Sequence, residues 1–364
     1  MSEWAVEWLE GAVARDALAK ADPADWSRPL HSVFQHPLLL GAWLDSKGPA
    51  MGSGFALARL RRESSEVLVP LAIRRQGSGL LRLRRGIGVG EPHFDYQVPI
   101  LCSGRVVWQE FWPDAVRALL RAGRLDELRF CRVPADRAPA GAEVDSAERT
   151  TWIDLRGFQD FDEYLASRGS NLRSDVRRRL RRCEEKGGCR LEVFGVGDGV
   201  AAVAALGRMR AAYESLHADT PSAHLFSLPG TWAFYMLMIE RLLPAGLLHF
   251  SELSIGGEAA AWHFGFLFES ALHWYKPTYS PKYADLGVGK VLLAELTRTG
   301  ISAGWSMIDF GGGTEPYKDA WGNRSCELKH LQFWGRRPGG QALRLRHAGR
   351  FYPRRRPVAS GSRT

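Results

Sequence analysis

The two halves of this chain carry predicted elements in the same order, and this order restricts the fold more than any single motif does. Each half has helical patterns, then an antiparallel hairpin or meander, then a helix and a last strand. Residues 134 to 150, between the halves, have the composition of a linker. Because no residue-level repeat is visible, the order of elements alone predicts two related lobes. Ligand sites commonly lie between such units, so we expect the site in the cleft between the lobes.

Hydrophobic periodicity predicts the individual elements. In the first half these are a helix within 31 to 46, a hairpin of strands 54 to 61 and 66 to 74, a helix at 109 to 122 and a strand at 127 to 133. In the second half these are helices at 171 to 187, 199 to 217, 231 to 243 and 288 to 303, and strands near 189 to 195, 247 to 255, 258 to 268, 271 to 277 and 305 to 310. Alternation of helices with short strands indicates an α/β (α+β) fold.

Length and composition predict two domains. The chain has 364 residues, of which 45% are apolar, enough for more than one hydrophobic core. We expect an N-terminal lobe with its linker over residues 1 to 150, a C-terminal lobe over 151 to 335 and a tail over 336 to 364. The five cysteines are scattered, with no histidine at metal spacing, so we expect reduced thiols, no metal and a cytoplasmic location. With no basic leader and no apolar run of about 18 residues, neither a signal peptide nor a transmembrane segment is expected.

The net charge of +9 comes entirely from the tail. Residues 336 to 364 contain nine arginines and no lysine, aspartate or glutamate, so basic and acidic residues balance in the rest of the chain. A Pro, Gly, Arg and Ser-rich end without hydrophobic periodicity predicts a poorly ordered extension. Contact with RNA or an anionic membrane is the alternative interpretation.

A second basic feature is the predicted helix at 171 to 187. Its apolar residues recur at helical spacing, and seven basic side chains occupy the other faces. Arg177 and Arg181 lie one turn apart, with Arg178 beside them, and such a surface of forked donors suits a phosphate group. The alternative is a solvated face that pairs with the acidic residues of the same helix.

Residues 307 to 323 have the pattern of a loop at the end of a strand. A short apolar run ends at Asp309, three glycines follow, and Tyr317 and Lys318 come before the next apolar run, residues 331 to 334. Glycines allow positive φ and close approach of a ligand to the main chain. A plain glycine-rich turn with a solvated lysine is the equally weighted alternative.

A third candidate is the start of the helix at 288 to 303. Gly287, Val288, Gly289 and Lys290 place glycines where free backbone N–H groups can hold a pyrophosphate. The pattern is not a Walker A loop, because Ala284 replaces its first glycine. An ordinary glycine-rich helix start is the alternative.

Several chemistries are excluded by absent motifs. The sequence has no H-E-x-x-H, no G-x-S-x-G and no dinucleotide-binding glycine fingerprint. Asp309-Phe310-Gly311 matches the metal-binding triplet of kinases, but no H-R-D loop precedes it.

Taken in order, these segments resemble GNAT-related acyltransferases of the Fem-like and cellulose-biosynthesis-protein type. The resemblance is clearest from about Asn171 to Trp334. Its anchors are the basic helix, the paired strands at 258 to 266 and 272 to 279, Leu286 to Leu293, Asp309 to Gly313, Tyr317-Lys318 and Trp321-Gly322. The first half fits more loosely, through Phe34 to Pro37, Val69 to Arg74 and Asp95-Tyr96.

The resemblance implies two GNAT-like lobes, each a mixed, mostly antiparallel sheet flanked by helices, and transfer of an acyl group to an amine. GNAT relatives commonly use acyl-CoA, whereas Fem relatives use aminoacyl-tRNA and acylate a cell-wall precursor. No permanently bound cofactor is implied. The pyrophosphate signature of GNAT relatives is not kept, since Ala284 stands where they have Gln or Arg.

The resemblance also suggests roles for individual residues. Lys318 is expected to neutralise developing negative charge or a donor phosphate. Asp309 is expected to orient Lys318, to accept the proton of the amine or to tie down the glycine turn. Tyr275 and Tyr317 are expected to protonate the leaving group, with packed aromatic rings as the alternative. Donor-binding candidates are Gly287, Val288, Gly289, Lys290, Arg177, Arg178 and Arg181. Acceptor-binding candidates are His263, Asp95, Tyr96 and Glu315.

Three functions follow. The first is a CoA-dependent N-acyltransferase acting on a small amine, an amino sugar or a cell-envelope precursor. The second is an aminoacyl-tRNA-dependent transferase, and the third is a non-catalytic binding protein in polysaccharide assembly.

Overall fold

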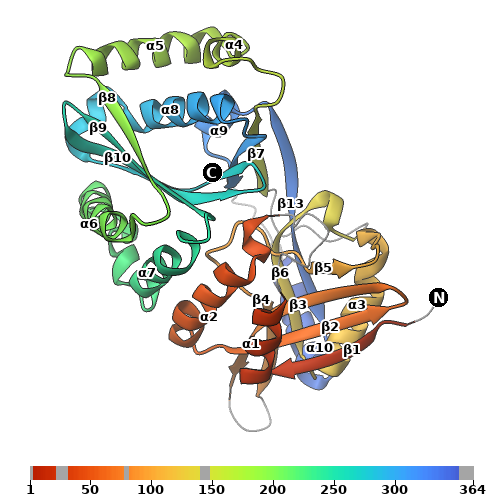
Figure 1. The fold of residues 1–364 in the computed structure, drawn as a ribbon. Coiled ribbons are helices and arrows are strands. Elements are labelled where there is room, and N and C mark those ends of the chain that lie inside the picture. The colour runs from red at the N-terminus through yellow and green to blue at the C-terminus, as the bar shows by residue number, and fades with distance from the viewer. Residues whose placement is uncertain (1–2, 22–31, 78–81, 140–147, 352–364) are drawn as a thin grey trace, which may run out of the picture.

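One continuous sheet runs through both halves of the molecule. The computed structural model describes residues 3–21, 32–77, 82–139 and 148–351. In these residues thirteen strands have the order β1-β2-β3-β4-β6-β13-β7-β12-β11-β10-β9-β8, with β5 paired to β3. The strands belong to two lobes, one above the other in Figure 1. The predicted α/β architecture, with mostly antiparallel strands flanked by helices, is confirmed.

The N-terminal lobe is organised around the predicted hairpin. Its elements are β1 (Ala5–Glu10), α1 (Gly11–Lys20), α2 (Pro37–Ala50), β2 (Gly54–Arg62), β3 (Ser65–Gln76), β4 (Leu83–Gly88), β5 (Ile100–Ser103), α3 (Trp108–Ala122) and β6 (Glu127–Pro134). Alternate residues of β2 point to opposite faces. Phe55 and Leu57 pack with α1 and α2, whereas Ala56 and Ala58 pack with the aromatic face of α3. Both faces of the hairpin are therefore buried.

The C-terminal lobe repeats this plan. Its elements are β7 (Glu148–Asp154), α4 (Phe161–Ala166), α5 (Ser170–Glu184), β8 (Cys189–Phe194), α6 (Gly199–Leu216), α7 (Thr231–Leu242), β9 (Leu248–Ile255), β10 (Glu258–Phe268), β11 (Ala271–Tyr279), α8 (Val288–Ser302), β12 (Met307–Gly312), α9 (Pro316–Trp321), β13 (Arg324–Trp334) and α10 (Pro338–Phe351). Helices α4, α5 and α8 cover one face of the sheet, and α6 and α7 cover the other (Figure 1).

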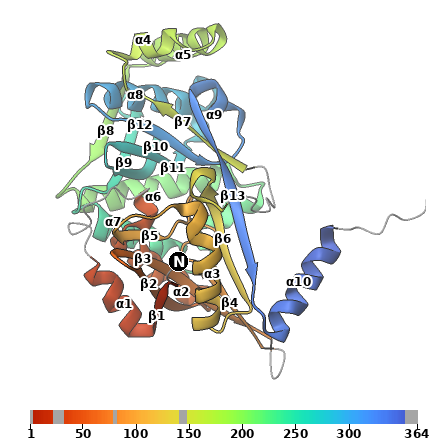
Figure 2. The same cartoon turned by 90° about the vertical axis from the view of Figure 1, so that its right-hand side faces the viewer.

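The lobes share both a strand and a core. The first half of β13 pairs with β7, and its second half pairs with β6 of the N-terminal lobe, so the strand runs along both lobes in Figure 2. One hydrophobic cluster also joins α2 to α7, where Leu39 and Trp43 are packed together with Phe234 and Met238. Residue 150, the predicted lobe boundary, lies inside β7.

Each lobe contains one parallel pair of strands, connected through a helix. These pairs are β4 with β6 and β11 with β12, and each pair is in register over only three residues. In the N-terminal lobe Gln97 bridges the strands where they part. Its Nε2 donates to Gly88 O (2.9 Å), and its Oε1 accepts from Cys131 N (2.7 Å).

Several short elements escaped prediction. The sequence patterns do not predict strands β1, β4, β5 and β7 or helices α1, α4 and α9, because runs of four to ten residues carry weak periodicity. The tail also differs from the expected extension. Residues 338–351 form α10, which projects from the end of β13 in Figure 2, and residues 352–364 lie outside the described residues.

Candidate functional site

The predicted glycine loop ends β12 at the junction of the two lobes. β12 pairs with β7 up to Gly312, with an irregularity after Asp309. Gly311 and Gly313 have φ values of 63° and 136°, which side chains rarely adopt. A Cβ on Gly311 would lie 2.6 Å from the Asp95 carboxyl carbon, and one on Gly312 would lie 2.8 Å from Glu148 Oε1. The glycines therefore have two roles. They adopt backbone angles that other residues rarely adopt, and they leave space for the side chains of Asp95 and Glu148.

Asp309 is held in one position by donors from both lobes. Its carboxylate accepts hydrogen bonds from Tyr96 Oη (2.7 Å), Thr150 Oγ1 (3.0 Å) and Gly311 N (2.9 Å). His273 Nδ1 lies 3.5 Å away, and burial lowers the pKa of that imidazole. Asp309 is 7% exposed. Because its oxygens are occupied and buried, Asp309 positions Tyr96 and the glycine loop.

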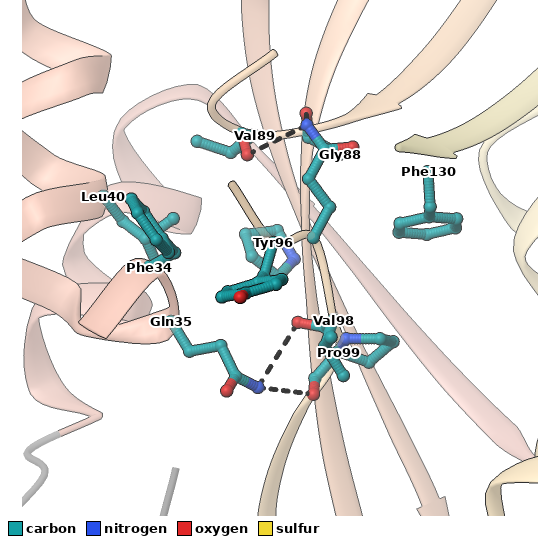
Figure 3. Close-up of a pocket in the computed structure, with 11 residues that line it drawn as sticks. Phe34, Gln35, Leu40, Gly88, Val89, Tyr96, Val98, Pro99 and Phe130 are labelled. Atoms are coloured by element: carbon teal, nitrogen blue, oxygen red, sulfur yellow. Dashed lines mark hydrogen bonds between the residues drawn. The ribbon is translucent and has the colours of Figure 1, made fainter. Parts of the chain in front are cut away.

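Tyr96 belongs to a segment that fills the N-terminal lobe. Its ring lines a cavity of about 20 Å³ together with Phe34 and Gly88 (Figure 3). Gln35 closes the same cavity through hydrogen bonds from Nε2 to the carbonyl oxygens of Val98 (3.4 Å) and Pro99 (2.9 Å). Such a space holds about one water molecule. This cavity is therefore too small for a substrate.

Asp95 differs from Asp309 in exposure and in its contacts. Its side chain is 21% exposed. Burial raises the pKa of Asp95 to about 6, against the opposing effect of Arg132 and Lys318. Arg132 NH1 is 3.8 Å from its carboxylate. Because its pKa is about 6, Asp95 can exchange a proton with a ligand near neutral pH.

Arg132 connects Asp95 to a second acid. Its Nε donates to Glu148 Oε1 (2.9 Å), and His330 Nε2 lies 2.9 Å from Glu148 Oε2. Hydrogen bonds to Cys131 and Glu148 raise the pKa of His330 to about 9. The Glu148 charge is thereby neutralised from two sides, and Arg132 is fixed beside Asp95.

Lys318 is buried, which excludes the interpretation as a solvated surface lysine. It lies on α9, is 3% exposed, and its Nζ donates to Gly312 O (2.8 Å) and pairs with Glu315 (2.9 Å). Its charge also lowers the pKa of Asp95. Lys318 therefore closes the glycine loop and stabilises the ionised form of Asp95. Glu315, a predicted acceptor contact, has a side chain that is 56% exposed.

The two candidate tyrosines pack against different hydrophobic clusters. A register shift in β11 places Trp274 and Tyr275 opposite Gly265. Tyr275 packs against the rings of Phe34 and Phe266, and burial followed by the charge of Asp95 raises its pKa. Tyr317 packs edge-on against Phe310 in the other core, and burial followed by Glu315 raises its pKa. Both hydroxyls are protonated at neutral pH.

His263 is separate from this group. It is 0% exposed, its Nδ1 lies 3.1 Å from His249 Nδ1, and its ring stacks on Trp274. Burial lowers its pKa well below the usual value. His263 is therefore a core residue of the sheet and does not contact substrate as expected.

The predicted donor-binding segments meet at the start of α8. Gly287 is the left-handed residue before the helix, and a Cβ there would overlap the Arg179 guanidinium of α5. Lys290 Nζ (2.6 Å) and Arg179 Nε (3.0 Å) both donate to Asp175. Although burial opposes it, these bonds hold the Asp175 pKa at about 2. Val288 is fully buried, and Gly289 follows it in the first turn.

The predicted arginine stripe faces outward instead. Arg177, Arg178 and Arg181 have side chains that are 62%, 59% and 73% exposed, and each pairs with an acid on or near α5. Two other arginines of α5 reach the start of α8. Arg179 lies against Gly287, and Arg182 donates from NH1 to the carbonyl oxygen of Asp285 (3.0 Å), just before that helix.

Several members of the site were missed from the sequence. Arg132 comes just before the predicted linker, and Glu148 and Thr150 lie within its last residues, where no motif marked them. Arg179 was overlooked because the helical pattern did not show which side of α5 faces α8. Thr150 could not be placed from the sequence, because its position depends on the hydrogen-bonding register between β7 and β12.

Comparisons with known proteins bear on the fold and on the C-terminal lobe. Residues 170–319 match the family of acetyltransferase (GNAT) domains. No curated protein sequence matches the chain. Among solved structures, FemX is 11% identical with a TM-score of 0.61, covering 93% of this chain and 99% of FemX. The C-terminal domain of a putative lysylphosphatidylglycerol synthetase from Agrobacterium fabrum is 14% identical with a TM-score of 0.54, covering 92% and 97%. A Bacteroides thetaiotaomicron protein of unknown function is 9% identical with a TM-score of 0.57, covering 90% and 100%.

Proposed function

We propose that this chain transfers an acyl group, acetyl in the simplest case, from acyl-CoA to an amine, because residues 170–319 match the acetyltransferase (GNAT) domain and the double-lobe fold resembles that of FemX. The acceptor is a small molecule, an amino sugar or a cell-envelope precursor. The proposal rests mainly on the position and the raised pKa of Asp95. It is a partly exposed carboxyl with a pKa of about 6, set against Gly311 beside the point where β11 and β12 part.

Asp95 is suited to accept the proton that an attacking amine must lose. The amine nitrogen forms a bond to the acyl carbon, the carbon–sulfur bond breaks, and the amine proton passes to Asp95. The thiolate that leaves then takes up a proton, for which the Tyr275 and Tyr317 hydroxyls are the nearby donors. Lys318 and Arg132 keep Asp95 ionised often enough to act, because both lower its pKa.

The start of α8 is suited to hold the phosphates of the donor. Backbone N–H groups of the first turn carry the positive end of the helix dipole. The Arg179 guanidinium lies over Gly287, and Lys290 lies in the same turn. Arg179 and Lys290, which share Asp175 as a partner, thus place donor groups near the start of α8, where GNAT relatives have a Gln or Arg at the position of Ala284.

One observation favours aminoacyl-tRNA as the donor instead. Arg177, Arg178 and Arg181 form an exposed basic surface on α5, and the fold is shared with FemX. Binding of tRNA through such a surface would weaken steeply with salt.

Release of free CoA thiol from acetyl-CoA, measured against a panel of amines, tests the leading proposal. We expect amine-dependent release with the native chain and its loss with Asp95→Ala, while Lys282→Ala, an exposed lysine paired with Glu258, retains it. Stabilisation of the fold by acetyl-CoA but not by tRNA would exclude the second donor. Stabilisation by tRNA alone, with no thiol release, would refute the first.

A further inference from the structure

Three positive charges act on His93, which lies two residues before Asp95. They are Lys47 of α2, Lys276 of β11 and Arg74 of β3. Of the three, Lys276 also interacts electrostatically with Asp95. Burial first, and then these three charges, lower the His93 pKa to about 4. Trp43 Nε1 donates to His93 Nδ1 (3.3 Å), so the neutral ring carries its proton on Nε2. The cluster is therefore made of three cations around an uncharged imidazole.

These cations lack acidic partners. In the described ranges, no carboxylate lies within the 4.0 Å ion-pair distance of Lys47, Arg74 or Lys276. By contrast, Arg132 and Lys318, whose charges act on Asp95, each have a carboxylate in contact. Partly buried cations are normally paired, so an unpaired group of three indicates that an anion completes it.

The three cations differ in how many donors they have left. Lys47 is 4% exposed and donates to Pro229 O (3.0 Å) and Thr231 Oγ1 (2.8 Å), so it contributes charge from a fixed position. Arg74 donates from Nε to Ser53 Oγ (3.3 Å), and its NH2 faces the sulfur of Met51.

Lys276 has its donors available. Its Nζ lies 5.3 Å from the centre of the Tyr213 ring, and among the described residues no hydrogen bond or ion pair involves this nitrogen. Burial lowers the pKa of Lys276, and the charge of Asp95 opposes that shift. The register shift at Gly265 turns Lys276 to the same side of the sheet as Tyr275. A ligand at Asp95 is thereby within the electrostatic reach of Lys276.

We propose that Lys276, supported by Arg74, binds an anionic group of the acceptor, a carboxylate or a phosphate, while the amine of the acceptor faces Asp95. The acceptor is therefore an acidic amine, such as an amino acid or an amino-sugar phosphate. This inference rests on the proposed function, because it assigns the substrate class of the same site. Charge-assisted hydrogen bonds from Lys and Arg are the usual means of recognising such groups.

Binding of simple anions tests the cluster without any acyl transfer. Inorganic phosphate and malonate, at constant ionic strength, are titrated into the native chain and into Lys276→Gln, with thermal stability as the readout. Lys282→Gln removes the same charge from an exposed ion pair and serves as the control. We expect the native chain and the control to be stabilised by one of the two anions and Lys276→Gln to lose that response. An equal response in all three, or none, would overturn the proposal, and the favoured anion identifies phosphate or carboxylate.

Acyl transfer to matched amines separates this inference from the proposed function. Ethanolamine is compared with O-phosphoethanolamine, and cadaverine with lysine, with acetyl-CoA as donor. We expect KM to be about tenfold lower for the acidic member of a pair, and Lys276→Gln to remove that preference with little change in kcat. Equal use of acidic and neutral amines by the native chain would refute the inference and leave the function standing. Anion binding through Lys276 without transfer to any amine would refute the proposed function and, with it, the assignment of an acceptor, and would leave only an anion site.

Discussion

Substitution of Asp95 by Asn is expected to stabilise the protein at alkaline pH and to abolish its activity. The pKa of Asp95 is raised from 3.8 to about 6, mainly by burial. The folded state therefore favours the protonated carboxyl, and stability is lost as the pH rises from about 4 to about 6. A shift of about two pKa units corresponds to about 3 kcal/mol once the carboxyl is ionised. Asn resembles the protonated form and does not incur this cost.

The assay is urea unfolding of the native chain and Asp95→Asn at pH 8.0 and at pH 4.0, with thermal unfolding as a second measure. At pH 8.0 the variant is expected to be more stable by about 3 kcal/mol, or about 4 °C for a chain of this length. At pH 4.0 most of the difference disappears, because Asp95 is then protonated in the native chain. A gain that does not change with pH, or a loss of stability at pH 8.0, would refute the reasoning.

Three further substitutions test the glycine loop, its lysine and the donor site. Gly311→Ala adds a Cβ against Asp95 and is expected to reduce kcat at least about tenfold. The control is Gly304→Ala, which has a similar φ of 71° but open space around it, and it should lose only about 1 kcal/mol of stability. Lys318→Gln removes a charge that lowers the Asp95 pKa, so the acidic limb of the pH–rate profile should move to higher pH; an unmoved limb contradicts the contact. Arg179→Ala should raise KM for acetyl-CoA about tenfold and Arg181→Ala should not, and the opposite result would favour the exposed face of α5.

The sequence predicted the fold better than it predicted the site. The β2–β3 hairpin and the strands from β9 to β11 follow from clear alternation of apolar residues, and their order led to the two-lobe architecture. The site depends on residues that meet only through strand register. Thr150 reaches Asp309 because β7 lies beside β12, although 159 residues separate the two in sequence. His263 alternates like its neighbours, and only its burial shows that it belongs to the core.

The two lobes use the same arrangement of parallel strands for different purposes. In the N-terminal lobe, Gln97 ties β4 to β6 where these strands part, and its segment fills the interior around Tyr96. In the C-terminal lobe, β11 and β12 part beyond His273 and Asp309, and the residue that approaches Gly311 there is Asp95, from the other lobe. A carboxyl on the C-terminal lobe itself, such as Asp309, is fully occupied by hydrogen bonds. Acyl transfer as proposed therefore requires both lobes, because the donor site lies on one and the proton acceptor is supplied by the other.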